Sequence, residues 1–214
     1  WGISDLARQL GLGKSTVHRL ATTLVAEGFL EQNSQNDRYR LGLLLFSMGT
    51  MVRRRLDVAA QSAVPLRTLA DMTQETVHLA VLHDDEILYL RNIESPHAIR
   101  PRSYLGVRMP AFCTAEGRAI LAHSPPAAVF TALSGKLLAR TPQTVVNKKA
   151  LMTKFEEVLQ DGYAIDNEES ELAMQGIAAP IFDATSQVIA AVGLVGPIHR
   201  LGKAKLKKLA PGVM

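Results

Sequence analysis

Residues 11–20 read GLGKSTVHRL and contain Gly-Lys-Ser-Thr at positions 13–16. This tetrapeptide ends the phosphate-binding loop of nucleotide triphosphatases, in which backbone amides and a lysine hold the phosphates. The loop also requires a glycine five residues before the Gly-Lys pair, after a strand, and this chain has Arg8 there. Residues 4–10 show helical rather than strand spacing of apolar residues. We therefore expect no nucleotide site, and ask whether these residues meet another phosphate.

A second possible chemistry is that of Cys113, the only cysteine in the chain. A thiolate nucleophile needs a nearby base, and the same half of the chain carries His78, His83, His97 and His123. No local signature of a cysteine enzyme accompanies Cys113, and a lone cysteine is usually a small core residue. We expect no enzyme, no metal site and no cofactor, and keep a Cys113-dependent enzyme as the less favoured alternative.

The composition is that of a globular protein, because 214 residues with 47% apolar content can bury one large or two small cores. No apolar run approaches the ~18 to 20 residues of a membrane helix, so we expect a cytoplasmic protein. The net charge is +4. Residues 1–60 hold eight Lys or Arg against five Asp or Glu, whereas the remainder holds sixteen against fifteen. The basic excess at the N-terminus favours contact with a polyanion.

The first 27 residues predict two helices joined by the glycine-containing turn of residues 11–13. The first has apolar residues at helical spacing, and Ser4 is placed to cap it. The second has Val17, Leu20, Ala21 and Leu24 on one stripe, with a polar and basic opposite face that holds no acid before Glu27. This arrangement is typical of a helix-turn-helix, whose second helix enters the DNA major groove.

Residues 29–42 predict a β-hairpin around the turn cluster of residues 33–37. A hairpin directly after a recognition helix is a wing, and Arg38 and Arg40 alternate on its return strand. We expect the wing to contact the DNA backbone or minor groove, while the helix reads bases. The predicted DNA-binding residues are Lys14, Ser15, Thr16, Arg19, Thr22, Thr23, Arg38 and Arg40. A packing module without DNA-binding activity remains the alternative.

The next segment, residues 41–73, has continuous helical apolar spacing that we expect to break near Asp57 and at Pro65. Its apolar residues are too many for an exposed helix, so we expect the helix to dock through Leu43, Leu44, Phe46, Met51 and Leu56. The run of arginines at 53–55 is interpreted as a solvated helix end.

The remaining residues predict an α+β domain with an antiparallel sheet covered by helices. Strand-like runs at 75–82 and 86–93 flank a turn, and residues 97–106 are a further extended candidate with Pro101 at an edge. A helix capped by Thr114 and an amphipathic helix at 148–162 follow. Two more strands, at 176–184 and 187–196, are separated by a turn at Thr185 and Ser186.

Residues 4–42 resemble the winged helix-turn-helix of the IclR family of bacterial transcriptional regulators, in which a Lys-Ser-Thr-Val-His-Arg-Leu run opens the recognition helix. The runs TAEGRAILAH, DNEESELAMQGIAAPIFD and VIAAVGLVGP are similar to that family's effector domain. The resemblance implies a further N-terminal helix before Trp1. It also implies a winged helix-turn-helix at 1–42, a linker helix at 43–56 that pairs subunits, and a GAF-like effector-binding domain at 57–214.

The same resemblance implies partners and a mechanism. The partners are double-stranded operator DNA, a small organic effector (carboxylate, aromatic or sugar-derived) and further copies of the chain, as a dimer or tetramer; no membrane is involved. Effector binding would shift the linker helices and so change operator affinity. A ligand-binding domain with a vestigial DNA module is the alternative.

The resemblance places the effector between the sheet and the loop that opens the 115–122 helix, where free amides at a helix start attract an anion. The residues it implies are Met109, Ala115, Glu116, Asp166, Gly176, Gly193 and Val195. Members that bind small keto acids carry hydroxyl residues where this chain has Gly193 and Val195, and Glu116 adds a negative charge. We therefore expect a larger or more apolar effector, such as an aromatic or sugar-derived acid, or a neutral compound. Asp166 could equally cap a loop.

Overall fold

The computed structural model describes residues 1–55 and 57–214, with side chains outside 53–56. The expected contribution of Leu56 to helix docking, and the interpretation of the 53–55 arginine side chains, lie outside the described residues. The chain divides into two compact units, Trp1–Leu56 and Asp57–Met214. Each is described by itself.

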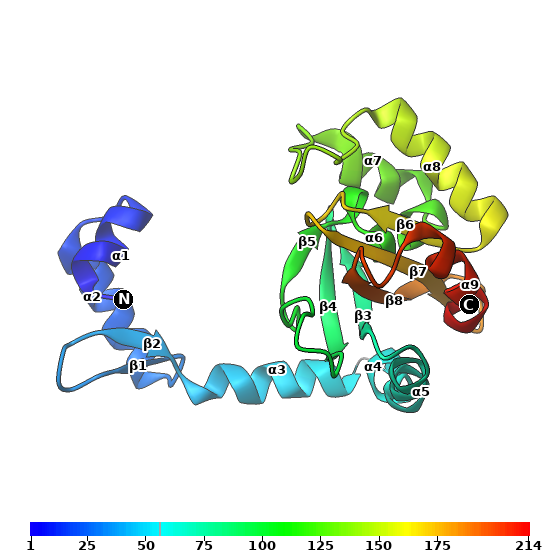
Figure 1. Cartoon of the computed structure of the whole chain (residues 1–214). Helices are drawn as coiled ribbons and strands as arrows, with labels where there is room; N and C mark the ends of the chain where they lie inside the picture. Colours follow the sequence, from blue (N-terminus) through cyan, green and yellow to red (C-terminus); the bar gives the residue numbers. More distant parts are fainter. Residues whose placement is uncertain (56) are drawn as a thin grey trace. The chain divides into compact units, whose positions relative to one another are not determined.

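The N-terminal unit contains a helix-turn-helix followed by a hairpin and a long helix (Figure 1). Its elements are α1 (Ile3–Leu10), α2 (Lys14–Ala26), β1 (Leu30–Gln32), β2 (Tyr39–Leu41) and α3 (Leu43–Arg55). Gly11 ends α1 with a φ of 64°, a left-handed conformation that glycine adopts without strain. The turn can therefore be only three residues long, which fixes where α2 starts.

Two details of this unit differ from the sequence prediction. The N-cap of α1 is Gly2, and Ser4 lies inside the helix without capping it. On α2, Val17 and Ala21 are buried as predicted, whereas Leu20 and Leu24 of the same stripe are exposed. The stripe is only half covered because the N-terminal unit packs α2 mainly against α1 and β1.

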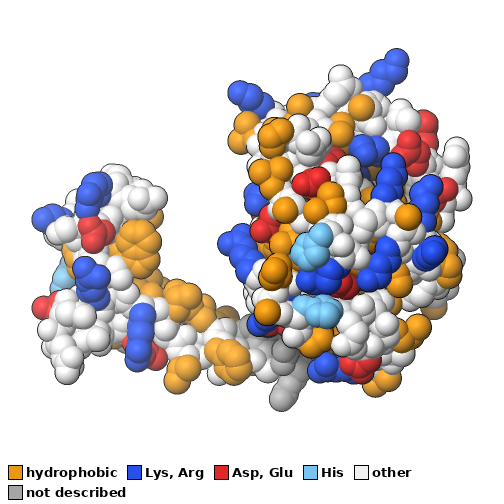
Figure 2. Space-filling view, viewed as in Figure 1, with side chains coloured by type: hydrophobic (Ala, Val, Ile, Leu, Met, Phe, Trp, Pro, Cys, Tyr) orange, Lys and Arg blue, Asp and Glu red, His pale blue; other side chains and the backbone are white. Residues whose placement is uncertain are grey.

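The predicted hairpin is present, with Leu30 opposite Leu41 and Gln32 opposite Tyr39. Arg40 lies in β2, and Arg38 lies directly before the strand. The helix α3 that follows leaves its apolar residues uncovered within its own unit. Leu43, Phe46 and Met51 are 77%, 75% and 61% exposed, and Figure 2 shows apolar side chains along this helix.

The C-terminal unit is an α+β domain, as predicted. Its helices are α4 (Asp57–Gln61), α5 (Ala63–Thr73), the 3-10 turn η1 (Ala111–Cys113), α6 (Ala115–Ala122), α7 (Pro126–Ser134), α8 (Lys148–Asp161) and α9 (Lys203–Val213). Its strands are β3 (Thr76–His83), β4 (Glu86–Ile93), β5 (Arg108–Pro110), β6 (Ala164–Asn167), β7 (Met174–Phe182) and β8 (Val188–Pro197). They form one antiparallel sheet in the order β5-β4-β3-β8-β7-β6.

Both faces of this sheet are covered. Side chains alternate along a strand, so His78 and Ala80 of β3 point to one face and Val77 and Leu79 to the other. The first face packs against α6, which also contacts α8 and η1. Helix α5 packs on β3 and β4, and α9 packs on β7 and β8. Residues buried beneath α6 therefore belong to a different layer from those beneath α5 and α9.

The structure corrects two expectations. Residues 97–106 form no strand, and the edge strand is the short β5 that follows them. Pro65 does not break the helix but is the third residue of α5. Proline is tolerated there because the first-turn amides of a helix have no acceptor inside the helix.

The start of α6 is built as predicted. The Thr114 hydroxyl accepts a hydrogen bond from the Gly117 amide, which caps the helix. A Cβ on Gly117 would lie 2.1 Å from the Ala111 carbonyl oxygen, so only glycine allows α6 to approach η1 this closely. This approach fixes Ala115 and Glu116, the first two residues of the helix, against the sheet.

Candidate functional site

The predicted DNA-binding residues of the N-terminal unit lie on an accessible surface. Lys14, Ser15, Arg19, Thr22 and Thr23 are exposed on α2, and Thr16 is half-buried. Arg38 and Arg40 are exposed on the hairpin. The structure thus leaves these side chains free to meet a partner.

The charge of α2 is suited to an anion. Its N-cap is Gly13, which has no capping side chain, and its first turn holds no acid. The first amides of the helix therefore lack acceptors, and the positive end of the helix dipole is not neutralised. Within the described residues, no carboxylate lies within 4.0 Å of Lys14 or Arg19.

The wing arginines differ in their partners. Arg40 is paired with Glu31 across the hairpin, with Nη2 2.7 Å from Oε2. No carboxylate of the described residues pairs with Arg38. The pair at Arg40 is exposed and so weakly held, which leaves that guanidinium able to exchange Glu31 for a phosphate.

Six of the seven residues predicted for the effector line one cavity of about 20 Å³ between α6 and the sheet. They are Met109, Ala115, Glu116, Asp166, Gly176 and Val195. The cavity is also lined by His78, Tyr89, Tyr104, Ser170, Glu171 and Met174. Its volume is roughly that of one water molecule, so its walls must separate before a larger molecule can enter.

Gly193 is the seventh predicted residue, and it lies next to the Glu116 carboxyl group. A Cβ at Gly193 would lie 2.3 Å from Glu116 Oε1. The space beside Gly193 is therefore filled by the Glu116 carboxylate. The glycine at 193 and the acid at 116 are thus packed directly against each other.

His78 and two tyrosines form the aromatic wall of the cavity. The Nδ1 atom of His78 lies 3.3 Å from Glu116 Oε1, and both side chains are buried. The His78 ring makes edge contacts with Tyr89 and Tyr104, with centroids 4.8 and 5.4 Å apart. Burial and the nearby Glu116 carboxylate raise the pKa of Tyr89 well above its ordinary value, so its phenol stays protonated.

Asp166, in β6, stabilises the acidic loop, residues 168–171. Its Oδ1 accepts hydrogen bonds from the amides of Glu169 (2.8 Å) and Ser170 (3.3 Å), so the capping role that the sequence left open is present. Asp166 also faces the cavity. Burial raises the pKa of Asp166 to about 6, although Arg118 and these hydrogen bonds oppose the shift.

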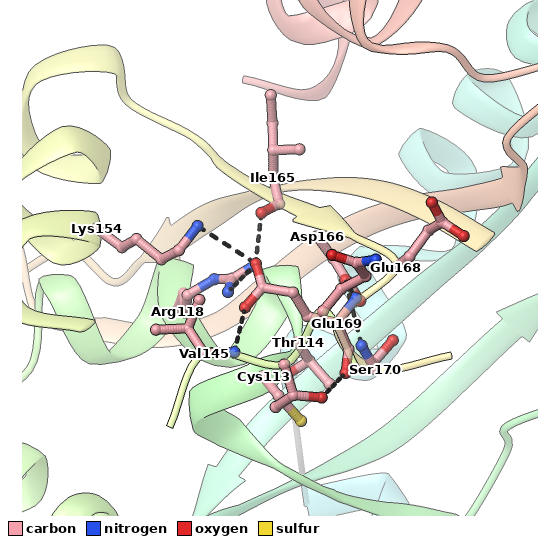
Figure 3. A network of polar contacts seen from close by, with 12 residues as sticks. Cys113, Thr114, Arg118, Val145, Lys154, Ile165, Asp166, Glu168, Glu169 and Ser170 are labelled. Atoms are coloured by element: carbon pink, nitrogen blue, oxygen red, sulfur yellow. Dashed lines mark hydrogen bonds and ion pairs between the residues drawn. The ribbon is translucent and has the colours of Figure 1, made fainter. Parts of the chain in front are cut away.

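The Glu169 side chain also holds the acidic loop in place. Figure 3 shows its carboxylate between Arg118, Lys154 and the Val145 amide. Arg118 Nη1 lies 2.8 Å and Lys154 Nζ 3.3 Å from Glu169 Oε1, and the Val145 amide donates to Oε2 at 3.3 Å. Arg118 also donates to the Ile165 carbonyl from Nη2. The side chains of Arg118 and Glu169 are only 1% and 3% exposed.

Two residues that line the cavity join two connecting segments. The Tyr104 hydroxyl, from the segment between β4 and β5, donates to Glu171 Oε2 of the acidic loop. Burial and this hydrogen bond raise the pKa of Tyr104.

Other hollows hold no predicted site residue. The apolar groove between α7 and α8, about 550 Å³, is larger than the cavity but lined mainly by aliphatic and aromatic side chains. Among the described residues, no group of three His, Cys, Asp or Glu side chains is placed to hold a metal ion. None of the described helices has the length and apolarity needed to cross a membrane.

Cys113 lies buried next to α6. Burial and the nearby Asp166 raise the pKa of its thiol to about 12. The thiolate required for nucleophilic attack is therefore scarce at neutral pH.

The sequence missed the cavity residues that reach it from other elements. His78 could have been placed on the α6 face from strand alternation, with Tyr89 beside it on β4. Nothing local marks Tyr104 or Glu171, because irregular segments carry them to the cavity, and Met174 is the first residue of β7.

Comparison with known proteins relates both units to one family. Residues 50–214 match the family described as bacterial transcriptional regulator IclR C-terminal, and residues 1–34 match the IclR helix-turn-helix domain. The HTH-type transcriptional regulator KdgR of Escherichia coli is 33% identical over 97% of this chain and 79% of its own length. The glycerol operon regulatory protein of Streptomyces coelicolor is 35% identical over 94% and 78%.

Among solved structures, an IclR homologue from Microbacterium hydrocarbonoxydans complexed with 4-hydroxybenzoate has a TM-score of 0.82 and 28% identity. The match covers 99% of this chain and 89% of that one. The similarity thus extends across both units.

The pKa of Asp166 generates a prediction about stability. The folded pKa is about 6 against an ordinary 3.8, so the folded state binds more protons than the unfolded state between these values. The free energy of unfolding should fall by up to about 3 kcal/mol as the pH rises through this window. Asp166→Asn, which keeps an oxygen at Oδ1, should remove that slope in urea unfolding from pH 4 to 7.

Asp161→Asn serves as the control, because Asp161 is an exposed carboxyl at the end of α8. It should leave the slope as in the unmodified chain. An unchanged slope in Asp166→Asn would show that this carboxyl does not titrate in the window.

Proposed function

The chain belongs to the IclR family of bacterial transcriptional regulators, and on this premise we propose which of its surfaces bind DNA and effector. It is a regulator of the IclR type, with a helix-turn-helix module and a C-terminal effector domain. We assign residues 1–42 to DNA binding, 43–56 to the linker helix and 57–214 to effector binding. We place it in the cytoplasm, where a bacterial regulator meets DNA.

Helix α2 is the proposed reading helix. The observation that carries this assignment is its exposed N-terminal face, where Lys14 and Arg19 have no carboxylate partner in the described residues and the helix start is uncapped by any acid. Arg19 lies one and a half turns into the helix, a position from which a guanidinium reaches guanine in the major groove. Lys14 and the first amides are suited to the flanking phosphate.

Two further groups of the N-terminal unit complete the proposed surface. The hydroxyls of Thr22 and Thr23 donate to carbonyls one turn back in α2, so they present their remaining lone pairs and methyl groups outward. Arg38 and Arg40 of the wing supply phosphate contacts that position α2 without reading sequence.

The cavity beneath α6 is the proposed effector site. It collects six residues that the family resemblance implies, although they come from β5, α6, β6, β7 and β8. It is buried, it contains polar side chains without full sets of partners, and two of its lining residues, Tyr104 and Glu171, hydrogen-bond each other. Such a site can hold a small molecule once its walls separate.

Control of DNA binding follows from population shift. An effector that binds better when the Tyr104 segment and the acidic loop are apart stabilises that arrangement by its difference in affinity. If α3 takes a different position in that arrangement, the effector also changes the affinity for the operator. The size of that change is the coupling free energy between the two sites.

We propose that the chain works as a dimer or a dimer of dimers. Two recognition helices must meet half-sites about one helical turn or more apart, which needs at least two copies. Leu43, Phe46 and Met51 of α3 are exposed within their unit and present an apolar surface to cover.

An enzymatic role is not supported. The family consists of transcriptional regulators, and the one thiol of the chain is buried with its pKa raised to about 12.

The reading role of Arg19 predicts a loss of sequence-specific binding. Arg19→Ala should weaken binding to DNA selected from a random pool by the unmodified chain by roughly 1 to 3 kcal/mol, because a bidentate contact to a base is lost. Binding to unselected DNA should change less. Fluorescence anisotropy at several salt concentrations measures both.

Arg67→Ala on α5 is the control, since it removes the same charge from an exposed position of the C-terminal unit. An Arg19→Ala chain that keeps full affinity for the selected DNA would refute the assignment of α2. Failure to select any DNA would instead favour a vestigial DNA module.

The apolar surface of α3 predicts an effect on self-association. Phe46→Ser should shift the chain toward monomer in sedimentation velocity, because it removes an exposed aromatic from the proposed contact. Phe130→Ser, an equally exposed phenylalanine on α7, is the matched control. Equal effects of the two substitutions, or none of Phe46→Ser, would argue against α3 as the pairing helix.

A further inference from the structure

The charges that line the cavity have one sign. Glu116, Asp166 and Glu171 contribute three carboxyl groups, and no lysine or arginine is among the residues that line it. Arg118 lies close to Asp166 but is paired with Glu169. Arg102 lies over the Tyr104 ring, 5.5 Å from its centroid, and is exposed on the protein surface. A bound carboxylate would therefore meet carboxyl groups without a cation of its own.

The hydrogen-bonding capacity of His78 also argues against a carboxylate as the ligand. Its Nδ1 faces Glu116 Oε1 at 3.3 Å, and because a carboxylate only accepts, Nδ1 carries the proton. In the neutral ring, Nε2 is then an acceptor. Nε2 is buried and has no partner among the described residues. An unpaired buried acceptor is costly, and a ligand group that donates a hydrogen bond would relieve that cost.

The two buried carboxyl groups of the cavity differ in their partners. Asp166 accepts the amides of the acidic loop through Oδ1, and the Ser170 side chain also hydrogen-bonds this carboxylate. Glu116 approaches His78 through Oε1, and its Oε2 is without a donor in the described part of the chain. Together with His78 Nε2, the Glu116 carboxylate offers the cavity acceptors for donors that the protein does not supply.

The position of Glu116 is enforced by the fold. Its carboxyl group occupies the space beside Gly193, where a Cβ would lie 2.3 Å from Oε1 and 2.7 Å from Cδ. A hydroxyl-bearing side chain at 193, which could donate to an anionic ligand, is excluded while Glu116 holds this place. At this point of the wall the chain thus presents a carboxylate acceptor.

We propose that the effector of this chain is a small molecule that donates several hydrogen bonds and carries no anionic group, such as a polyol or a polar amine, rather than a carboxylate. This inference rests on the proposed function, in which the cavity is the effector site. The hydroxyl or ammonium groups of the ligand meet His78, Glu116 and Asp166, and its carbon skeleton packs between the tyrosine rings and Met109. Entry requires the walls of the cavity to separate.

The test uses sets of ligands with the same skeleton and different charge. D-glucitol, D-gluconate and D-glucamine form one set; benzyl alcohol, benzoate and benzylamine form the other. Each is titrated calorimetrically into the full chain at pH 8. We expect the neutral or cationic member of a set to bind at least about tenfold more tightly than the acid, because like charges within a partly buried site repel strongly. The comparison of polyol with amine identifies which source of donors the site prefers.

Two isosteric variants relate this preference to the cavity. Glu116→Gln and Asp166→Asn each remove one negative charge and keep the shape, so each should reduce the ratio of neutral to acid affinity at least about threefold. Having two variants protects the test against one that fails to fold. Glu157→Gln, an exposed acid on α8, is the control and should leave the ratio unchanged.

The possible results test the ligand class and the assignment of the cavity as the effector site separately. Tighter binding of the acids, with a response to the cavity variants, would overturn the ligand class and keep the cavity as the effector site. Binding that ignores both variants would overturn the cavity assignment and the inference with it. Binding of no probe to the unmodified chain or to either variant would also overturn the inference.

Discussion

The buried ion pair between Arg118 and Glu169 is the interaction on which the C-terminal unit depends most. Both side chains are almost fully buried, so the loss of either would leave an uncompensated charge inside the protein. Arg118 extends from α6, and Glu169 belongs to the acidic loop that follows β6. The pair therefore fastens the loop to the helix, and the hydrogen bond from Arg118 to the Ile165 carbonyl adds the strand. The cavity lies between the elements held in this way.

The same pair determines the electrostatics of the cavity. Because Arg118 is paired with Glu169, its charge only partly offsets that of Asp166. Helix α6 contributes a positive side chain to the loop anchor and a negative one to the cavity, two residues apart. Asp166 then keeps a raised pKa in spite of the nearby guanidinium, since burial outweighs that attraction. An acceptor-rich cavity next to a buried arginine is thus a consequence of how the loop is held.

Local signals made much of the fold predictable from the sequence. The glycine turn before α2, the cap at Thr114 and the hairpin between β3 and β4 depend on neighbouring residues, and all three are present. Pro65 was misjudged because its effect depends on its position within the helix. Residues 97–106 were misjudged because edge pairing depends on what lies beside the segment.

The candidate site was less predictable. Family resemblance gave six lining residues, but Tyr104 and Glu171 meet through long-range packing that no local pattern encodes. The resemblance implied that relatives carry a hydroxyl residue where this chain has Gly193, whereas the Glu116 carboxyl group that fills the space beside this glycine could be seen only in the structure. The polar face of α2, in contrast, could be predicted from the sequence, because helical periodicity alone places its residues on one side of the helix.

The cavity beneath α6 and the proposed DNA-binding face of α2 are, in the proposed mechanism, coupled. The most direct measurement is calorimetry of the tightest non-anionic probe with the full chain, once alone and once saturated with selected DNA. Linkage requires DNA to change the probe affinity by the same factor by which the probe changes DNA affinity. We expect the two factors to be equal to each other and different from one. A probe that binds the cavity with the same affinity in both titrations would contradict the coupling.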